Sequence, residues 1–273
     1  MFNEIFLAFL EEAKLSKELL ALGVTQLYKA NYANKGIYFQ SFTCLYSGFE
    51  RLEKLCLILN YYIKSNGCLP NENDIRKYGH NINALFEKCR QIENEHNLRV
   101  NFKCKLDDEI HTSILEVLND FAKSSGRYSN MNTLINAPKT DIDCLENWYN
   151  NVDLKIYSVN VTLAKKQKIE NNAKAIGSIL NQFGLAIFST EDNLVITDHE
   201  ELSRRTGIWE AIAKYRQLYT LQIIRYLSEI IIELGHKAMI INNQDIPYFS
   251  EIFGLFYNDD SYFKTRKTWD KLQ

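Results

Sequence analysis

The sequence predicts an all-α protein with an antiparallel helical bundle in its N-terminal half and a helical extension in its C-terminal half. Three observations favour this fold class. The chain has only 3 prolines and 11 glycines in 273 residues, which is few for a turn-rich β fold. Its clearest segment repeats apolar residues at the spacing of a helix. Polar or glycine-containing stretches then divide the first half into four such segments.

The central helix of the predicted bundle covers residues 38–64. Its apolar residues recur every three or four positions and comprise Tyr38, Phe42, Leu45, Phe49, Leu52, Cys56, Leu59 and Ile63. Further apolar residues widen this stripe, so we expect the helix to contact more than one neighbour. A helix over residues 3–30 precedes it, and Gly23 is a candidate for a kink or break in that helix.

Two further helices complete the bundle. A loop with the sequence SNGCLPNEND follows the central helix, and the third helix begins near His80 or Asn81. The fourth helix covers residues 106–123, where acidic residues at its start suit the positive end of the helix dipole. Four antiparallel helices with short connections form a bundle.

The chain divides near residues 126–150, a segment rich in serine, asparagine and glycine. This boundary separates a bundle of residues 1–135 from a helical region of residues 136–273. The second region either forms its own unit or packs on the bundle as one unit.

Two helices are expected in the second region, over residues 151–184 and 199–234. Asp198 and Gly235 are the expected start and stop signals of the later helix. Between the two helices, LAIFST and LVITD flank a turn-forming EDN sequence, which predicts a short β-hairpin. A buried helical connection is the alternative interpretation.

Composition excludes several classes of protein. The 32 basic and 34 acidic residues nearly balance, so any contact with RNA has to be local. Six cysteines without a CxxC pair favour reduced thiols in a cytoplasmic protein. The apolar runs fall short of the roughly 20 residues of a membrane span, and glutamates interrupt the N-terminal run, so no membrane contact is expected. No P-loop, GxSxG, HExxH or dinucleotide-binding motif occurs, and we expect neither a metal nor a cofactor.

Two stretches, SGFERLEKLCLILNYY and KYGHNINALFEKC, resemble the second and third helices of HEPN domains. The residues that carry the likeness are Glu50, Arg51, Lys54 and His80. A patch after the fourth helix is similar to the Arg-Tyr or Arg-Asn element of that family, and it comprises Arg127, Tyr128 and Asn130. The resemblance covers about residues 1–135 and identifies these seven residues as candidates for binding RNA or a protein partner.

The resemblance implies a helical bundle that is often a homodimer and that acts in toxin–antitoxin, abortive-infection or other antiviral systems. Many members are metal-independent ribonucleases that use an arginine followed, after four to six residues, by a histidine. No histidine follows Arg127 at that spacing. Arg90 and His96 do have it, but on one straight helix they would lie about 9 Å apart along the axis and roughly 120° apart in direction.

Three functions remain open. The first is a HEPN-like protein in bacterial defence or stress response that binds RNA or a protein partner. The second is a metal-independent endoribonuclease, with Arg90 and His96 as the catalytic pair or with a composite site at a dimer interface. The third is a structural subunit that docks a partner. Structural roles compete at each position, since Glu50 and Lys54 also fit a simple helix ion pair and His80 also fits a local cap.

Overall fold

The computed structural model describes residues 3–101, 106, 109–123, 134–135, 143–184 and 187–270. Within these ranges the regular secondary structure is helical apart from one two-stranded antiparallel hairpin, which confirms the predicted all-α fold and the predicted hairpin. The helices and strands are α1 (Glu4–Lys29), α2 (Lys35–Lys64), α3 (Glu72–Arg76), α4 (Ile82–His96), α5 (Glu109–Ala122), α8 (Cys144–Trp148), α9 (Leu154–Asn160), α10 (Leu163–Leu180), β1 (Phe188–Ser189), β2 (Val195–Ile196), α11 (His199–Ile241), α12 (Phe249–Phe253) and α13 (Asp260–Thr265). Short turns of 3-10 helix occur at η1 (Tyr32–Asn34) and η3 (Gly254–Phe256), and a π-helical turn forms η2 (Tyr149–Asp153).

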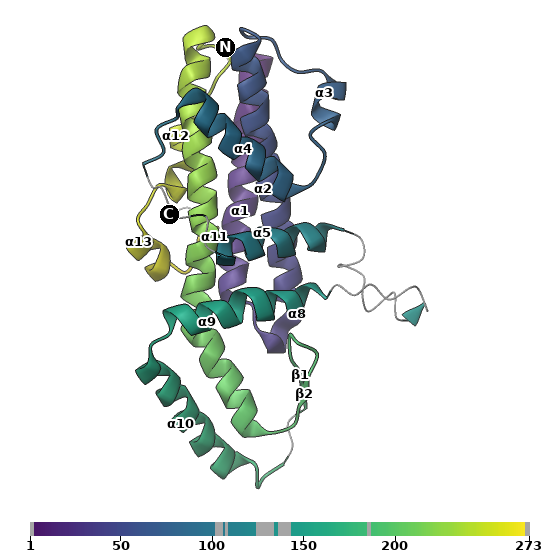
Figure 1. Ribbon diagram of the computed structural model, residues 1–273, viewed down its shortest axis with the longest axis vertical. Coiled ribbons are helices and arrows are strands. Elements are labelled where there is room, and N and C mark those ends of the chain that lie inside the picture. The colour runs from purple at the N-terminus through teal and green to yellow at the C-terminus, as the bar shows by residue number, and fades with distance from the viewer. Residues whose placement is uncertain are drawn as a thin grey trace.

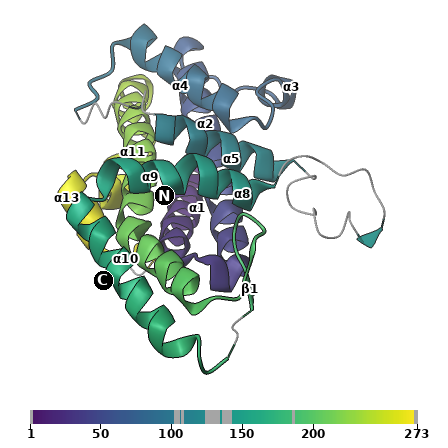
Figure 2. The ribbon, with the colours of Figure 1, turned by 60° about the horizontal axis from the view of Figure 1, so that its bottom comes forward.

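Three long helices, α1, α2 and α11, run side by side along the long axis of the molecule (Figure 1). The helices α4, α5, α8 and α9 cross one face of this group, as the tilted view also shows (Figure 2). The predicted stripe of α2 is enclosed, with Phe42, Leu45 and Leu52 fully buried. The long axis of the bundle therefore draws on both halves of the chain, because α11 packs on α1 and α2.

Glycine allows α1 and α2 to approach closely at two reciprocal points. A Cβ atom on Gly23 would lie 2.7 Å from Cγ of Leu45, and one on Gly48 would lie 2.7 Å from Cγ of Leu20. Of the kink or break expected at Gly23, the break is wrong, because α1 runs through this residue without interruption. The glycine serves packing between the helices instead, and Ser41 Oγ donates a 2.8 Å hydrogen bond to its carbonyl oxygen.

The boundaries of the two C-terminal helices differ from the prediction. The single helix expected over residues 151–184 is wrong, because Val161 is extended and Thr162 caps a new helix by accepting a hydrogen bond from the amide of Lys165. The stop expected at Gly235 is also wrong, because α11 continues to Ile241. A Cβ atom on Gly235 would lie 2.6 Å from the ring of Phe249, so this glycine makes room for α12.

A buried arginine joins the N-terminal helices to the second half of the chain. The Arg216 guanidinium donates to both carboxylate oxygens of Asp153 and, at 2.7 Å each, to the carbonyl of Ala30 and the hydroxyl of Tyr38. That hydroxyl in turn donates to the hairpin residue Glu191 over 3.0 Å. Burial raises the pKa of Asp153 to about 6, although Arg216 opposes the increase.

Candidate functional site

Three of the residues that carry the resemblance to HEPN domains come together between α2 and the start of α4. Nζ of Lys54 donates to Oε1 of Glu50 over 2.6 Å, and Nδ1 of His80 lies 2.8 Å from the same oxygen. The Tyr46 hydroxyl donates to the carbonyl of His80 over 2.7 Å. Glu50 and Lys54 are mostly buried, whereas the imidazole of His80 is 81% exposed. The cluster therefore presents one accessible imidazole on a fixed carboxylate.

The local sequence explains this arrangement. Glu50 and Lys54 are four residues apart and so lie on the same face of α2. Gly79 has a φ of +73°, a left-handed conformation that glycine adopts readily, and it turns the chain immediately before His80. The side chain of Asn81 caps α4 by accepting a hydrogen bond from the amide of Ala84. His80 therefore is not the cap and its ring is available to Glu50.

Hydrogen bonding keeps the Glu50 carboxylate ionised. Burial on its own would raise the pKa of Glu50, but the hydrogen bonds from Lys54 and His80 outweigh it and hold the pKa below its ordinary value of 4.5. Because an ionised carboxylate only accepts hydrogen bonds, Nδ1 of His80 is the donor.

Arg51 lies beside this cluster and links α2 to α1. Its Nη1 atom donates to both carboxylate oxygens of Glu12, at 2.8 and 3.0 Å. A cavity of about 340 Å³ opens between the two charged clusters. The residues that line it are Glu12, Ser47, Glu50, Arg51, Lys54, Leu55, Ile58 and Ile75.

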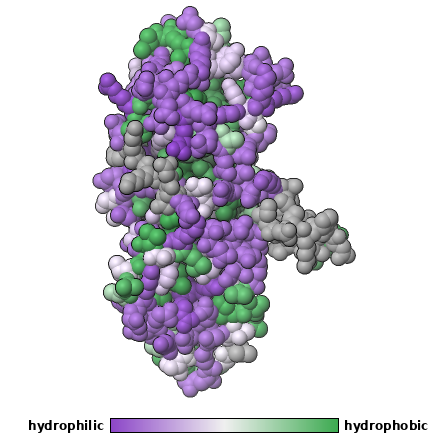
Figure 3. Space-filling model, in the orientation of Figure 1, coloured by the Kyte–Doolittle hydropathy of each residue, from purple (hydrophilic) through white to green (hydrophobic). Residues whose placement is uncertain are grey.

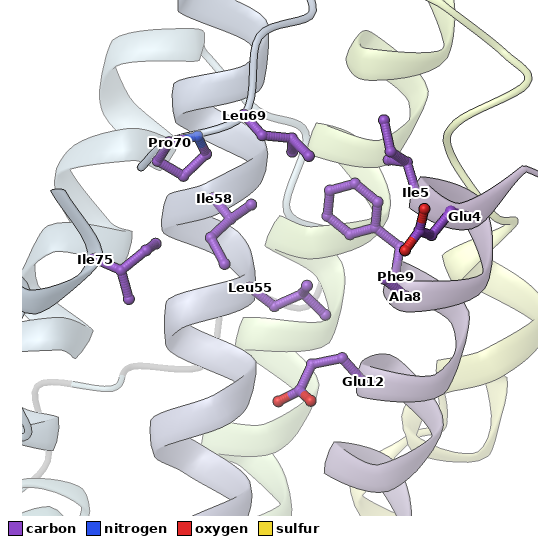
Figure 4. Close-up of a pocket in the computed structure, with 10 residues that line it drawn as sticks. All are labelled: Glu4, Ile5, Ala8, Phe9, Glu12, Leu55, Ile58, Leu69, Pro70 and Ile75. Atoms are coloured by element: carbon purple, nitrogen blue, oxygen red, sulfur yellow. The ribbon is translucent and has the colours of Figure 1, made fainter. Parts of the chain in front are cut away.

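A second cavity of about 520 Å³ continues from the first and is mainly apolar (Figure 4). Its lining consists of Glu4, Ile5, Ala8, Phe9, Glu12, Leu55, Ile58, Leu69, Pro70 and Ile75. Four residues line both cavities, namely Glu12, Leu55, Ile58 and Ile75. Residues of α1 face residues of α2 across the space, with Leu69 and Pro70 at its margin (Figure 4). We call the two joined cavities the α1–α2 groove.

No family model, curated protein or solved structure matches this chain. The resemblance to HEPN domains therefore stays a prediction that depends on the residues quoted above.

The two candidate catalytic residues, Arg90 and His96, have separate surroundings. Nη1 of Arg90 donates to Glu87 over 3.3 Å, whereas Nε2 of His96 lies 2.7 Å from Oδ1 of Asn60 on α2. Burial lowers the pKa of His96 below its ordinary value of 6.5. Arg90 shares a small cavity of about 140 Å³ with His111 and not with His96. Within the described residues, the contacts of Arg90 and His96 therefore belong to different surroundings.

The remaining candidates lie outside the described residues, namely Arg127, Tyr128 and Asn130. Within the described ranges, no group of three or more histidine, cysteine or acidic side chains is placed to hold a metal ion. In the same ranges, every helix is too short or too polar to cross a bilayer.

Sequence reasoning missed the apolar half of the groove. Its margin comes from Leu69, Pro70 and Ile75, which lie in the segment expected to be a plain loop and in the short helix α3. Leucine and proline side by side in a polar stretch were the available signal. Glu12 was also missed, because its pairing with Arg51 spans 39 residues of sequence.

Proposed function

We propose that this chain is a HEPN-like interaction protein of bacterial defence or stress response, and that its α1–α2 groove binds an apolar segment of a partner protein. The observation that carries the proposal is the joined groove itself. One end is apolar, and the other holds charged groups that already neutralise one another. Such a surface suits a peptide segment better than a nucleic acid.

The charges of the groove argue against RNA as its occupant. Both cations are engaged, Arg51 by Glu12 and Lys54 by Glu50. The lining contains three carboxylates, with Glu4 as the third, against these two cations. Binding to RNA depends on cations that neutralise phosphates, and here each phosphate would have to displace a carboxylate.

The shape of the groove favours an amphipathic helix. Ile5 and Phe9 are one turn apart on α1, and Leu55 and Ile58 are one turn apart on α2. A partner helix that lays apolar residues along this seam would repeat the packing between helices found elsewhere in the molecule. Because Glu4 on the α1 side leaves the lining with one more carboxylate than cations, the partner is expected to carry lysine or arginine beside its apolar face.

Fluorescence anisotropy with designed peptides tests this proposal. The probe is a labelled helical peptide with leucines on one face and two flanking lysines, and a second probe replaces both lysines with glutamates. We expect saturable binding of the lysine probe and weaker binding of the glutamate probe. Ile58→Arg is expected to weaken binding of the lysine probe at least about tenfold, or about 1.4 kcal/mol. The matched control is Leu15→Arg, which changes an exposed leucine of α1 outside the groove.

A parallel experiment with labelled single-stranded RNA in EDTA distinguishes this proposal from RNA binding and from ribonuclease activity. We expect neither retention of RNA at physiological salt nor cleavage. RNA retention that is lost in His80→Ala would overturn the proposal in favour of RNA binding. Cleavage that is lost in His96→Ala would overturn it in favour of a ribonuclease. Equal peptide binding by wild type and Ile58→Arg would remove the groove as the site.

A further inference from the structure

The segment between α2 and α4 borders the α1–α2 groove but packs little on the rest of the chain. Its helix α3 stands to the side of α2 on two connecting loops (Figure 1). None of the residues of α3 is buried, and within the described chain α3 packs along no other helix. We call residues 68–78 the strap.

The contacts that tie the strap to its neighbours by polar groups lie at its two ends. At the start, Oγ of Ser65 donates a 2.7 Å hydrogen bond to the carbonyl oxygen of Cys68. At the end, Nζ of Lys88 on α4 lies 5.3 Å from the centre of the Tyr78 ring. Among the described residues, the hydrogen bonds of residues 69–77 all stay within residues 71–79. The middle of the strap is therefore free of polar ties to the bundle.

The charges of the strap are also satisfied inside it. Arg76 pairs with Glu72 at 2.6 Å and Lys77 pairs with Asp74 at 3.0 Å, so the four charges cancel. The outer surface of α3 is hydrophilic in the space-filling view, at the upper right (Figure 3). Attraction between charges therefore does not hold the strap to α1 and α2.

Three apolar side chains of the strap line the larger cavity of the groove without filling it. They are Leu69, Pro70 and Ile75 (Figure 4). Leu69 is still 43% exposed. The cavity that they border measures about 520 Å³, which lies within the roughly 300–1,000 Å³ of ligand pockets. These side chains can therefore gain contacts from an apolar segment that enters the groove.

The backbone at both ends of the strap has left-handed residues, which suit hinges. Asn66 and Gly67 have φ angles of 54° and 96°, and Gly79 has a φ of 73°. A Cβ atom on Gly79 would find nothing within 4 Å, so close packing does not fix this residue. A segment that buries little apolar surface between two such points can move at small cost in free energy.

We infer that the strap is a hinged third wall of the α1–α2 groove, which closes on the bound segment and adds Leu69 and Ile75 to its contacts. The inference rests on the proposed function, since its occupant is the same lysine-bearing amphipathic helix. A helix laid along α1 and α2 covers their facing sides and leaves an apolar edge beside the strap. Closure buries that edge together with Leu69, so binding favours the closed strap and the closed strap favours binding.

Amide hydrogen exchange followed by mass spectrometry tests the closure. In the free chain, residues 71–78 are expected to exchange faster than α4. A saturating concentration of the lysine probe is expected to slow their exchange at least about tenfold. Helix α10 lies at the other end of the molecule and is the internal reference, with unchanged exchange (Figure 1). A strap as protected as α4 in the free chain would overturn the hinges, and a strap whose exchange ignores the bound probe would overturn the closure.

Variants of the strap test its contacts with the bound helix. Leu69→Ser combined with Ile75→Ser is expected to raise the Kd of the lysine probe at least about tenfold. The urea midpoint of this variant is expected to stay close to that of the wild type, because the strap buries little. The matched control is Asn73→Ser, at an exposed position of α3 outside the lining, and its Kd is expected to equal that of the wild type.

Two outcomes separate this inference from the proposed function. Probe binding that survives the double substitution but is lost in Ile58→Arg would overturn the third wall and leave the groove as the binding site. A wild type that does not bind the lysine probe would overturn both.

Discussion

Glu53 provides a sharp test of the physical account of the bundle. Its side chain is fully buried in α2, and neither carboxyl oxygen has a hydrogen-bond partner among the residues that the structure describes. Burial raises the pKa of Glu53 well above its ordinary value of 4.5, and the nearby Cys89 and Glu50 raise it further. The folded state therefore favours the neutral form of this carboxyl.

The effect of this buried carboxyl on the free energy of unfolding therefore depends on pH. Because the folded pKa lies above the unfolded one, the contribution of Glu53 to stability is fully present below about pH 4.5. It is lost as pH rises, by about 1.4 kcal/mol for each pH unit, until pH reaches the folded pKa. The free energy of unfolding should therefore fall as pH rises above about 4.5 on account of this one residue, and the fall ends where pH reaches the folded pKa.

Urea unfolding at pH 5, 6 and 7 with Glu53→Gln measures this loss. Glutamine keeps the shape but cannot ionise, so its stability relative to the wild type should rise with pH, by up to about 1.4 kcal/mol for each pH unit below the folded pKa of Glu53. Glu53→Met also removes the unsatisfied polar atoms and should be more stable than Glu53→Gln at pH 7. The control Glu18→Gln changes an exposed carboxylate of α1. Parallel stability curves for wild type and Glu53→Gln would refute the reasoning.

Three other substitutions test separate features of the fold. Gly48→Ala should lower the free energy of unfolding by about 1–3 kcal/mol, because the new methyl group collides with α1. The control Gly36→Ala has open space around it and should be neutral or stabilising by up to about 1 kcal/mol. Equal effects of the two substitutions would contradict the close approach of α1 and α2. Asp153→Asn should lower the free energy of unfolding by about 3–5 kcal/mol, since it leaves the buried charge of Arg216 uncompensated. A loss no larger than that caused by the same substitution at an exposed aspartate would contradict this role. Thr162→Ala should cost about 0.5–2 kcal/mol and speed amide exchange at the start of α10, and unchanged exchange would mean that the cap is dispensable.

Local signals predicted the helices better than their ends. Asn81 at the start of α4 and the long stripe of α2 were readable, because caps and helix periodicity depend on residues close in sequence. Gly23 and Gly235 misled for a shared reason. Glycine was interpreted as a break or a stop, but at both positions a distant element, Leu45 or Phe249, occupies the space that a side chain would need.

The candidate site was also predicted only in part from the sequence. Glu50 and Lys54 were expected as a pair from their spacing, and the pair forms. That His80 joins them could not be derived from spacing, because 30 residues of chain separate it from Glu50. The apolar half of the groove depends on where the α3 segment comes to lie against α1, a matter of packing between elements.

By itself the sequence determined that this protein is helical, where its central helix lies, and which polar residues stand on that helix, because periodicity and capping act over one or two turns. Only the tertiary structure decided that α11 lies along α1 and α2, that Arg216 meets Asp153 across 63 residues, and that the α1–α2 groove forms. Those outcomes depend on which apolar faces cover one another, and many pairings of amphipathic helices satisfy the same local pattern.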